Sequence, residues 1–99
     1  LLDHVNTVGV HFERRLRSLA LRHPSIVEVR GVGLMRALQL NTDAATIVDA
    51  AREHGLLVNA TAQRVVRLLP ALNIETADID RAVDILDDVL SAAGSETAP

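Results

Sequence analysis

The sequence contains no cysteine and almost no aromatic residues, and each absence excludes a class of function. Without thiols, the 99 residues cannot form disulfides, thiolate zinc sites, iron–sulfur clusters or a cysteine nucleophile. Phe12 is the only aromatic side chain, so no stacking platform for single-stranded nucleic acid can form. The net charge of −3 argues against extensive phosphate binding, and we therefore expect no nucleic-acid partner.

Lysine is also absent, because all ten basic residues other than histidine are arginine. No side chain of this chain can therefore form a Schiff base with a carbonyl group. No apolar run approaches the roughly 20 residues that a membrane-spanning helix needs, and charged residues interrupt the first 20 positions, which excludes a signal peptide. We expect no membrane association and a cytoplasmic location. The chain starts with Leu1 inside an apolar periodicity and without an initiator methionine, which we interpret as a fragment of a longer protein.

The first 40 residues predict a long helix followed by two strands, within a single globular domain. Apolar residues at steps of three and four form one face of an amphipathic helix over residues 1–21: Leu1, Val5, Val8, Phe12, Leu16 and Leu19. The short apolar runs 26–30 and 34–40 predict strands. Gly31 and Gly33 permit a turn with positive φ between them.

The middle of the chain predicts a shorter helix and a second pair of strands. Asn41 and Thr42 are candidate N-terminal caps of a helix over residues 43–54. Residues 56–58 and 65–69 predict two further strands, joined by a polar connection.

The last part of the chain predicts a helix over residues 77–92 and a flexible tail over residues 94–99. The resulting element order is α-β-β-α-β-β-α. Its simplest packing is an α+β fold, a two-layer sandwich in which a small, mostly antiparallel sheet carries the helices on one face.

Most polar clusters predict no site. Gly31 and Gly33 resemble the start of a dinucleotide-binding loop, but Arg36 takes the place of the third glycine and a strand follows. The histidines lack metal-ligand spacing and the aspartates of the last helix lack a calcium loop; these residues are His4, His11, His23, His54, Asp80, Asp84, Asp87 and Asp88. We expect surface histidines and solvated acids on the outer side of that helix. No serine lies in a nucleophile elbow, so the sequence predicts no catalytic residue and no metal site.

Arg67 is an exception, because it is the only polar residue of the apolar run 65–69. This pattern predicts a guanidinium surrounded largely by apolar groups. A buried guanidinium needs a carboxylate or phosphate partner, and its planar fork suits a carboxylate. The residues alone leave several interpretations open: an internal salt bridge, an edge-strand arginine that reaches solvent, a side chain that snorkels out, or a ligand site.

Several blocks of residues resemble one enzyme family. Residues 55–60, followed by 65–74, are similar to the closing segment of class III pyridoxal-phosphate aminotransferases. Residues 30–35 fit the R-G-x-G-L segment that precedes it, and the helix opening at residues 75–79 suits the family's last helix. The block VVRLLPALN is specific for the family and moderately specific for its acetylornithine branch.

The resemblance implies a transamination in which the amino group of N-acetylornithine passes to 2-oxoglutarate, as part of arginine biosynthesis. It implies that residues 1–93 are the C-terminal small domain of a cytoplasmic homodimer. The large domain would hold pyridoxal 5'-phosphate and the Schiff-base lysine, so this chain alone would be inactive and would have no cofactor-binding residue. Arg67 falls on the family's arginine that binds the substrate α-carboxylate. Gly31 and Gly33 carry over as turn formers, and Arg36 matches no family role and is left as structural.

Two alternatives remain open. The first is another class III aminotransferase, with ornithine, succinylornithine or 4-aminobutyrate as the amino donor. The second is a stand-alone α+β interaction module. The resemblance implies that the missing large domain reads the distal end of the substrate, so these residues do not distinguish the donors.

Overall fold

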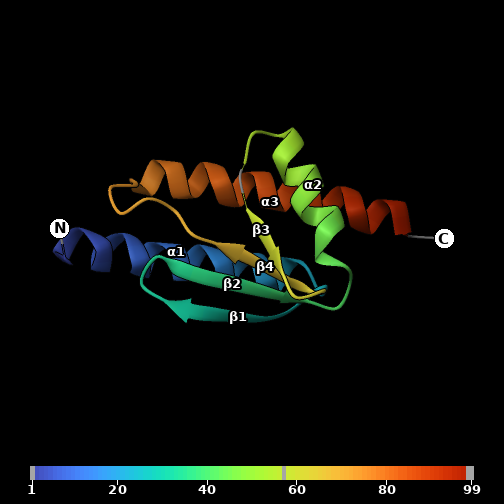
Figure 1. Cartoon of the computed structure of the whole chain (residues 1–99), viewed down its shortest axis with the longest axis horizontal. Coiled ribbons are helices and arrows are strands. Elements are labelled where there is room, and N and C mark those ends of the chain that lie inside the picture. Colours follow the sequence, from blue (N-terminus) through green and yellow to red (C-terminus); the bar gives the residue numbers. More distant parts are fainter. Residues whose placement is uncertain (1, 57, 98–99) are drawn as a thin grey trace.

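The elements of the chain follow the order α-β-β-α-β-β-α, as the sequence predicts (Figure 1). The structure is a computed structural model that describes residues 2–56 and 58–97. Its helices are α1 (Leu2–Arg22), α2 (Ala44–Glu53) and α3 (Thr76–Thr97).

The strands form one antiparallel sheet. They are β1 (Ile26–Val32), β2 (Met35–Leu40), β3 (Asn59–Thr61) and β4 (Val65–Leu68). Their spatial order is β1-β2-β4-β3, so β4 lies between β2 and β3, while β1 and β3 form the edges. Each neighbouring pair is antiparallel, which confirms the predicted α+β class.

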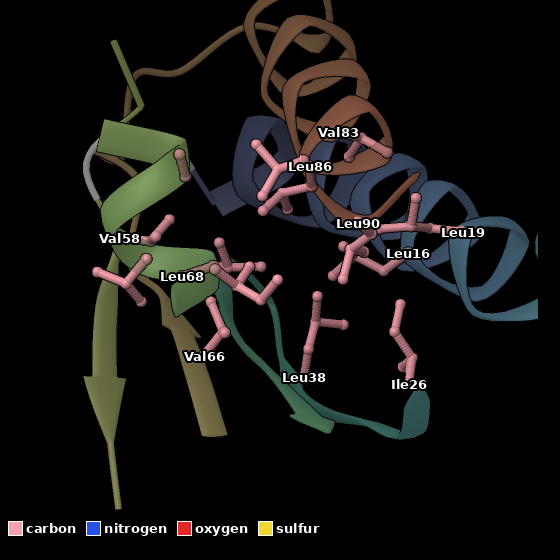
Figure 2. Close-up of a cluster of buried hydrophobic side chains, with 14 of the residues drawn as sticks. Leu16, Leu19, Ile26, Leu38, Val58, Val66, Leu68, Val83, Leu86 and Leu90 are labelled. Carbon is pink, nitrogen blue, oxygen red and sulfur yellow. The ribbon is translucent and has the colours of Figure 1, made fainter. Parts of the chain in front are cut away.

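The hydrophobic core lies between the helices and one face of the sheet (Figure 2). The predicted stripe of α1 is buried from Val8 to Leu19, whereas Val5 is half-buried and Leu1 lies outside the described residues. The sheet and α3 contribute further buried side chains, among them Leu38, Leu40, Val66, Leu68, Ile79, Val83, Leu86 and Leu90. Burying each such side chain contributes about 1.5–3 kcal/mol. This one-sided core holds the helices against one face of the sheet and leaves the other face uncovered.

The turn between β1 and β2 is shorter than the sequence predicts, because β1 continues through Gly31 to Val32. Gly31 has a φ of +121° and Gly33 a φ of +56°. L-residues with side chains rarely adopt such angles. A Cβ atom on Gly31 would also overlap the carbonyl oxygen of Met35. Glycine at this position therefore allows β1 to pair closely with β2.

The third strand lies later in the chain than the sequence predicts. β3 is formed by the polar residues expected to connect two strands, whereas Leu56 and Val58 belong to no strand and Leu57 lies outside the described residues. The physical reason is the place of β3 at the edge of the sheet, where its side chains are exposed. Val58 is buried in the core instead of pairing with a neighbouring strand.

Helix α2 begins one residue later than predicted, because its cap is Asp43 and not Asn41 or Thr42. The Oδ1 atom of Asp43 accepts a hydrogen bond from the backbone nitrogen of Ala45 at 3.0 Å. This bond satisfies one of the free N–H groups of the first turn. Gly55 follows the helix with a φ of +86°, in agreement with the left-handed termination that glycine favours.

Helix α3 is longer than predicted. It continues to Thr97, past the expected end at residue 92 and into the residues expected to form a tail, while residues 98 and 99 lie outside the described part. Among the helices of the described residues, none combines the length and apolar composition that crossing a membrane requires.

The prediction that the acids of α3 are solvated on its outer side is wrong for Asp80 and Asp87, which are partly buried in ion pairs with α1. Asp84 also pairs with Arg15 of α1 but is exposed, as predicted, and so is Asp88. The periodicity of α3 identifies its apolar face, but it does not show which polar flank lies beside a neighbouring helix. That choice follows from the packing of α1 against α3.

Candidate carboxylate-binding site

The uncovered face of the sheet presents a row of residues in register across its strands. Arg30 of β1 pairs with Ala37 of β2, and Ala37 pairs with Arg67 of β4. Arg67 in turn pairs with Asn59 of β3. Directly paired residues of an antiparallel sheet point to the same face. Because Ala37 is small, it leaves space between the two arginine side chains.

An open hollow of about 370 Å³ lies over this row. Among the side chains that line it are Arg30, Met35, Ala37, Thr61, Arg67 and Leu69. The described lining residues include the arginines Arg30, Arg36 and Arg67 and no acidic residue. A concave surface with this charge attracts small anions.

The prediction that Arg67 is surrounded largely by apolar groups is wrong. Val66 and Leu68 are buried, whereas Arg67 is exposed on the opposite face of β4. The apolar run in the sequence reflects Val65 and Leu69, which lie on the same uncovered face as Arg67. An apolar run indicates two-sided burial only where helices cover both faces of a sheet, and here they cover one.

The guanidinium of Arg67 forms no hydrogen bond or ion pair within the described part of the chain. The internal salt bridge that the sequence left open is therefore not found among these residues. Its exposure agrees with a side chain that reaches solvent, although β4 is a central strand and not an edge strand. Its fork of N–H donors remains available for two parallel hydrogen bonds to a carboxylate.

Arg30, by contrast, already has one hydrogen-bond partner and one ion-pair partner on the same face of the sheet. Its Nη2 atom donates to Oε1 of Gln39 at 2.5 Å, and its Nε atom lies 3.7 Å from Oε2 of Glu28. An incoming anion would compete with these contacts. Arg67 is therefore the better candidate for binding a carboxylate.

The buried arginine of the sheet is Arg36, for which the sequence predicts a structural role. Its side chain is 6% exposed and pairs with Glu13 of α1. A signal for this burial is present in the sequence, because Arg36 shares the period-two pattern of Leu38 and Leu40. That pattern places it on the covered face of β2, opposite to its neighbour Ala37.

The histidines predicted at the surface are in part built into the interface between α1 and α3. The Nε2 atom of His11 lies 2.6 Å from Oδ1 of Asp80, and that of His23 lies 2.6 Å from Oδ1 of Asp87. Only 12% of the His23 side chain is exposed. Within residues 2–56 and 58–97, no group of three metal-ligating side chains occurs.

The hydrogen bond from His23 lowers the pKa of Asp87 below its ordinary value. Burial of the carboxyl group raises the pKa and opposes this effect, while the positive charge of Arg22 lowers it further. These contacts join two helices on the covered side of the sheet. They stabilise the fold and supply no group to the hollow.

The residues of the hollow do not fit a covalently held aldehyde cofactor. Pyridoxal phosphate enzymes bind the cofactor through a lysine Schiff base, and the 99 residues contain no lysine. The free arginine and the open, partly apolar hollow fit a small carboxylate instead.

Comparison with known proteins identifies the family. Residues 1–90 match the family described as aminotransferase class-III. The acetylornithine aminotransferases of Methanothermobacter thermautotrophicus and Caldanaerobacter subterraneus are 43% and 41% identical over 91 residues. These matches cover 92% and 91% of this chain, but 23% of each relative. The chain thus spans about a quarter of the length of these enzymes.

Solved structures show the same fold. Acetylornithine aminotransferase from Elizabethkingia anophelis superposes with a TM-score of 0.83 at 26% identity, over 90% of this chain and 24% of that one. Lysine aminotransferase from M. tuberculosis gives 0.86 at 28% identity, over 90% and 21%. Class III aminotransferases generally depend on pyridoxal phosphate. The match over residues 1–90, together with this identity to curated enzymes, shows that the chain belongs to the class III aminotransferases.

Proposed function

We propose that this chain is the small domain that binds the substrate carboxylate in an aminotransferase that moves the amino group of N-acetylornithine to 2-oxoglutarate. The observation that carries the proposal is Arg67, an exposed arginine without a partner in the described residues, at the side of an anion-attracting hollow. Relatives with 41–43% identity that are acetylornithine aminotransferases support this donor over ornithine, succinylornithine or 4-aminobutyrate.

Both substrates carry an α-carboxylate. In 2-oxoglutarate it is adjacent to the oxo carbon that receives the amino group, whereas in N-acetylornithine the transferred amino group lies at the far end of the side chain, because the α-amino group is acetylated. We propose that a single arginine binds the α-carboxylate of the donor and of the acceptor in turn. Two parallel N–H···O bonds fix the orientation of the carboxylate as well as its position, which a lysine ammonium cannot do. Arg67 would bind and orient each substrate, and the chemical step itself would take place elsewhere.

The remaining three-quarters of the enzyme would supply the cofactor. Pyridoxal phosphate provides the electrophilic group that accepts and returns the amino group, and in this proposal the large domain of a cytoplasmic homodimer holds it. Val32, Met35 and Leu69 are 78%, 62% and 50% exposed on the same face as Arg67. An exposed apolar row beside the hollow suits a contact with another domain, which would also exclude water from the carboxylate.

The test is the substitution of Arg67 in the full-length aminotransferase that carries these residues. Arg67→Ala should lower kcat/KM about 30- to 1,000-fold for the amino donor and for 2-oxoglutarate alike, because both lose the same charged hydrogen bonds. Arg67→Lys keeps the charge and loses the fork, so it should weaken both substrates as well. The measurement is kcat/KM for each substrate separately.

Arg64→Ala is the matched control, because Arg64 is an exposed arginine of the same hairpin that does not line the hollow. It should leave both values unchanged, and the cofactor absorbance should be retained in all variants. A loss for one substrate only, or loss of the cofactor with unchanged substrate affinity, would contradict the proposed role of Arg67.

A further inference from the structure

The guanidinium of Arg36 connects α1 to the turn between β1 and β2. Its Nε atom donates to the carbonyl oxygen of Gly33 at 2.8 Å, and its Nη1 atom donates to that of Gly31 at 3.1 Å. From α1, Oε1 of Glu13 accepts from Nη1 at 2.8 Å, and the carbonyl oxygen of Gly9 accepts from Nη2 at 3.3 Å. One buried side chain thus holds three carbonyl groups and one carboxylate.

The backbone around Arg36 is packed so closely that it has little freedom to move. A Cβ atom on Gly9 would lie 3.1 Å from the carbonyl oxygen of Gly33, so α1 and the turn approach backbone to backbone. Gly31 and Gly33 both have positive φ angles. Arg36 binds the carbonyl oxygens of these same two glycines, and it therefore holds the turn in this conformation.

The turn that Arg36 holds is also one wall of the hollow. Arg30, Gly31, Met35 and Arg36 itself are among the residues that line the hollow from this hairpin, although only 6% of the Arg36 side chain is exposed. On β2, Arg36 points to the covered face, whereas the next residue, Ala37, points to the hollow and pairs with Arg67. A shift of the hairpin against α1 would therefore change the space in front of the Arg67 guanidinium.

We propose that Arg36, held by Glu13, is a positioning residue of the carboxylate site: it fixes the wall of the hollow against which a substrate carboxylate on Arg67 is oriented. This inference rests on the proposed role of Arg67. Arg36 does not touch the substrate and acts through the hairpin. Because the hairpin that Arg36 holds lines the hollow, loss of the Arg36 side chain should change substrate affinity as well as stability.

The experiment uses Arg36→Met in the full-length aminotransferase. Methionine fills the buried volume without donors, and Glu13 can be hydrated because 43% of its side chain is exposed. The variant should therefore fold. The expected result is a rise in KM of about 10-fold for both substrates with kcat changed less than about 2-fold, because the wall is needed for binding in the ground state and in the transition state. The cofactor absorbance should not change.

Glu13 provides a second and independent variant. Glu13→Ala removes the acceptor of Nη1 and should raise KM in the same direction, whereas Glu13→Gln retains an oxygen acceptor and should restore values close to the unsubstituted enzyme. Arg17→Ala is the matched control, because Arg17 lies 3.8 Å from the other carboxylate oxygen of Glu13 but does not reach the hairpin. It should leave KM unchanged.

A double substitution separates the positioning role from the role of Arg67. If Arg36 acts through the carboxylate site, Arg36→Met combined with Arg67→Ala should give a KM no higher than Arg67→Ala alone. Unchanged KM values in both Arg36→Met and Glu13→Ala would overturn the positioning role, whatever their melting temperatures. An unchanged KM in Arg67→Ala would instead overturn the carboxylate-binding function, and the positioning role with it.

Discussion

Two arginines on neighbouring strands of this small sheet have opposite surroundings. Arg36 lies on the covered face, where four hydrogen bonds replace the water that its guanidinium has lost. Arg67 lies on the uncovered face and remains hydrated, without a partner among the described residues. A guanidinium that is already satisfied cannot take up a ligand without losing bonds, whereas a hydrated one exchanges water for a carboxylate. This difference makes Arg36 suitable for positioning and Arg67 for binding.

Substitution of the turn glycines should separate backbone strain from steric overlap. Gly55→Ala places a Cβ atom in open space at a φ of +86°, and it should destabilise the chain by about 1–2 kcal/mol through backbone strain alone. Gly31→Ala adds an overlap with the Met35 carbonyl to a φ of +121°, and it should cost about 3 kcal/mol or more. Urea unfolding of the two variants measures both values. Equal losses would show that the backbone around Gly31 relaxes.

At the scale of elements, α1 and α3 are joined on their polar flanks as well as through the core. His11 and Arg15 of α1 meet Asp80 and Asp84, and Arg22 and His23 meet Asp87. The exposed pairs contribute little, since solvent screens them. The pair of His23 with Asp87 is the best shielded, with 12% and 18% of the side chains exposed. It is therefore the pair in this interface that solvent screens least.

The contribution of Asp87 should depend on pH in a defined direction. Its pKa in the folded chain is lowered from 3.8, chiefly by the hydrogen bond from His23, so the charged carboxylate favours the folded state. This stabilisation is present above pH 3.8 and is lost as the pH falls through the lower folded-state pKa. Asp87→Asn should thus cost about 1–3 kcal/mol at pH 7, and the difference from the unsubstituted chain should shrink toward pH 3. Urea unfolding at several pH values measures it.

Asp88→Asn serves as the control for that experiment. Asp88 is the next residue of α3, is exposed, and forms no ion pair with the described part of α1. Its substitution should leave the free energy of unfolding nearly unchanged at each pH. A loss for Asp87→Asn that stays constant from pH 7 to pH 3 would contradict the assigned cause of the pKa shift.

At the scale of the whole molecule, the helices bury one face of the sheet and leave the other open. The open face carries the hollow, the free arginine and an exposed apolar row. Relatives of about four times this length contain the same fold as about a quarter of their chain. The 99 residues therefore supply one side of the proposed site, and the other side would come from the remainder of the enzyme.

The chain alone should neither catalyse transamination nor retain pyridoxal phosphate, because it has no lysine to hold the cofactor. The measurement is the absorbance spectrum of the chain after incubation with the cofactor and desalting, followed by an assay with amino donor and 2-oxoglutarate. The full-length aminotransferase, treated in the same way, is the positive control. A stable imine absorbance on the isolated chain would contradict the assignment of the cofactor site to the rest of the enzyme.

The order of the elements and the buried face of α1 could be predicted from the residues alone, and so could the place of Arg67 in a family-specific block. The elements and the buried face follow from the spacing of apolar residues and from turn-forming glycines, and both signals can be read within one short segment of the sequence. The sequence did not determine the strand at residues 59–61, because an edge strand needs no apolar pattern when only one neighbour pairs with it.

Which arginine is buried and which is exposed without a partner among the described residues follows only from the packing of the folded chain. Whether a face of a strand is covered depends on helices that are distant in the sequence. Arg36 of β2, for example, is covered by α1, which carries its partner Glu13. The same holds for the acids of α3, whose partners on α1 and directly after it are more than 60 residues distant. A local sequence pattern predicts which residues share a face of a helix or strand, whereas long-range packing determines which face is exposed to solvent. The candidate site depends on this long-range packing, because a carboxylate binds most readily to an arginine that the fold has left without competing partners.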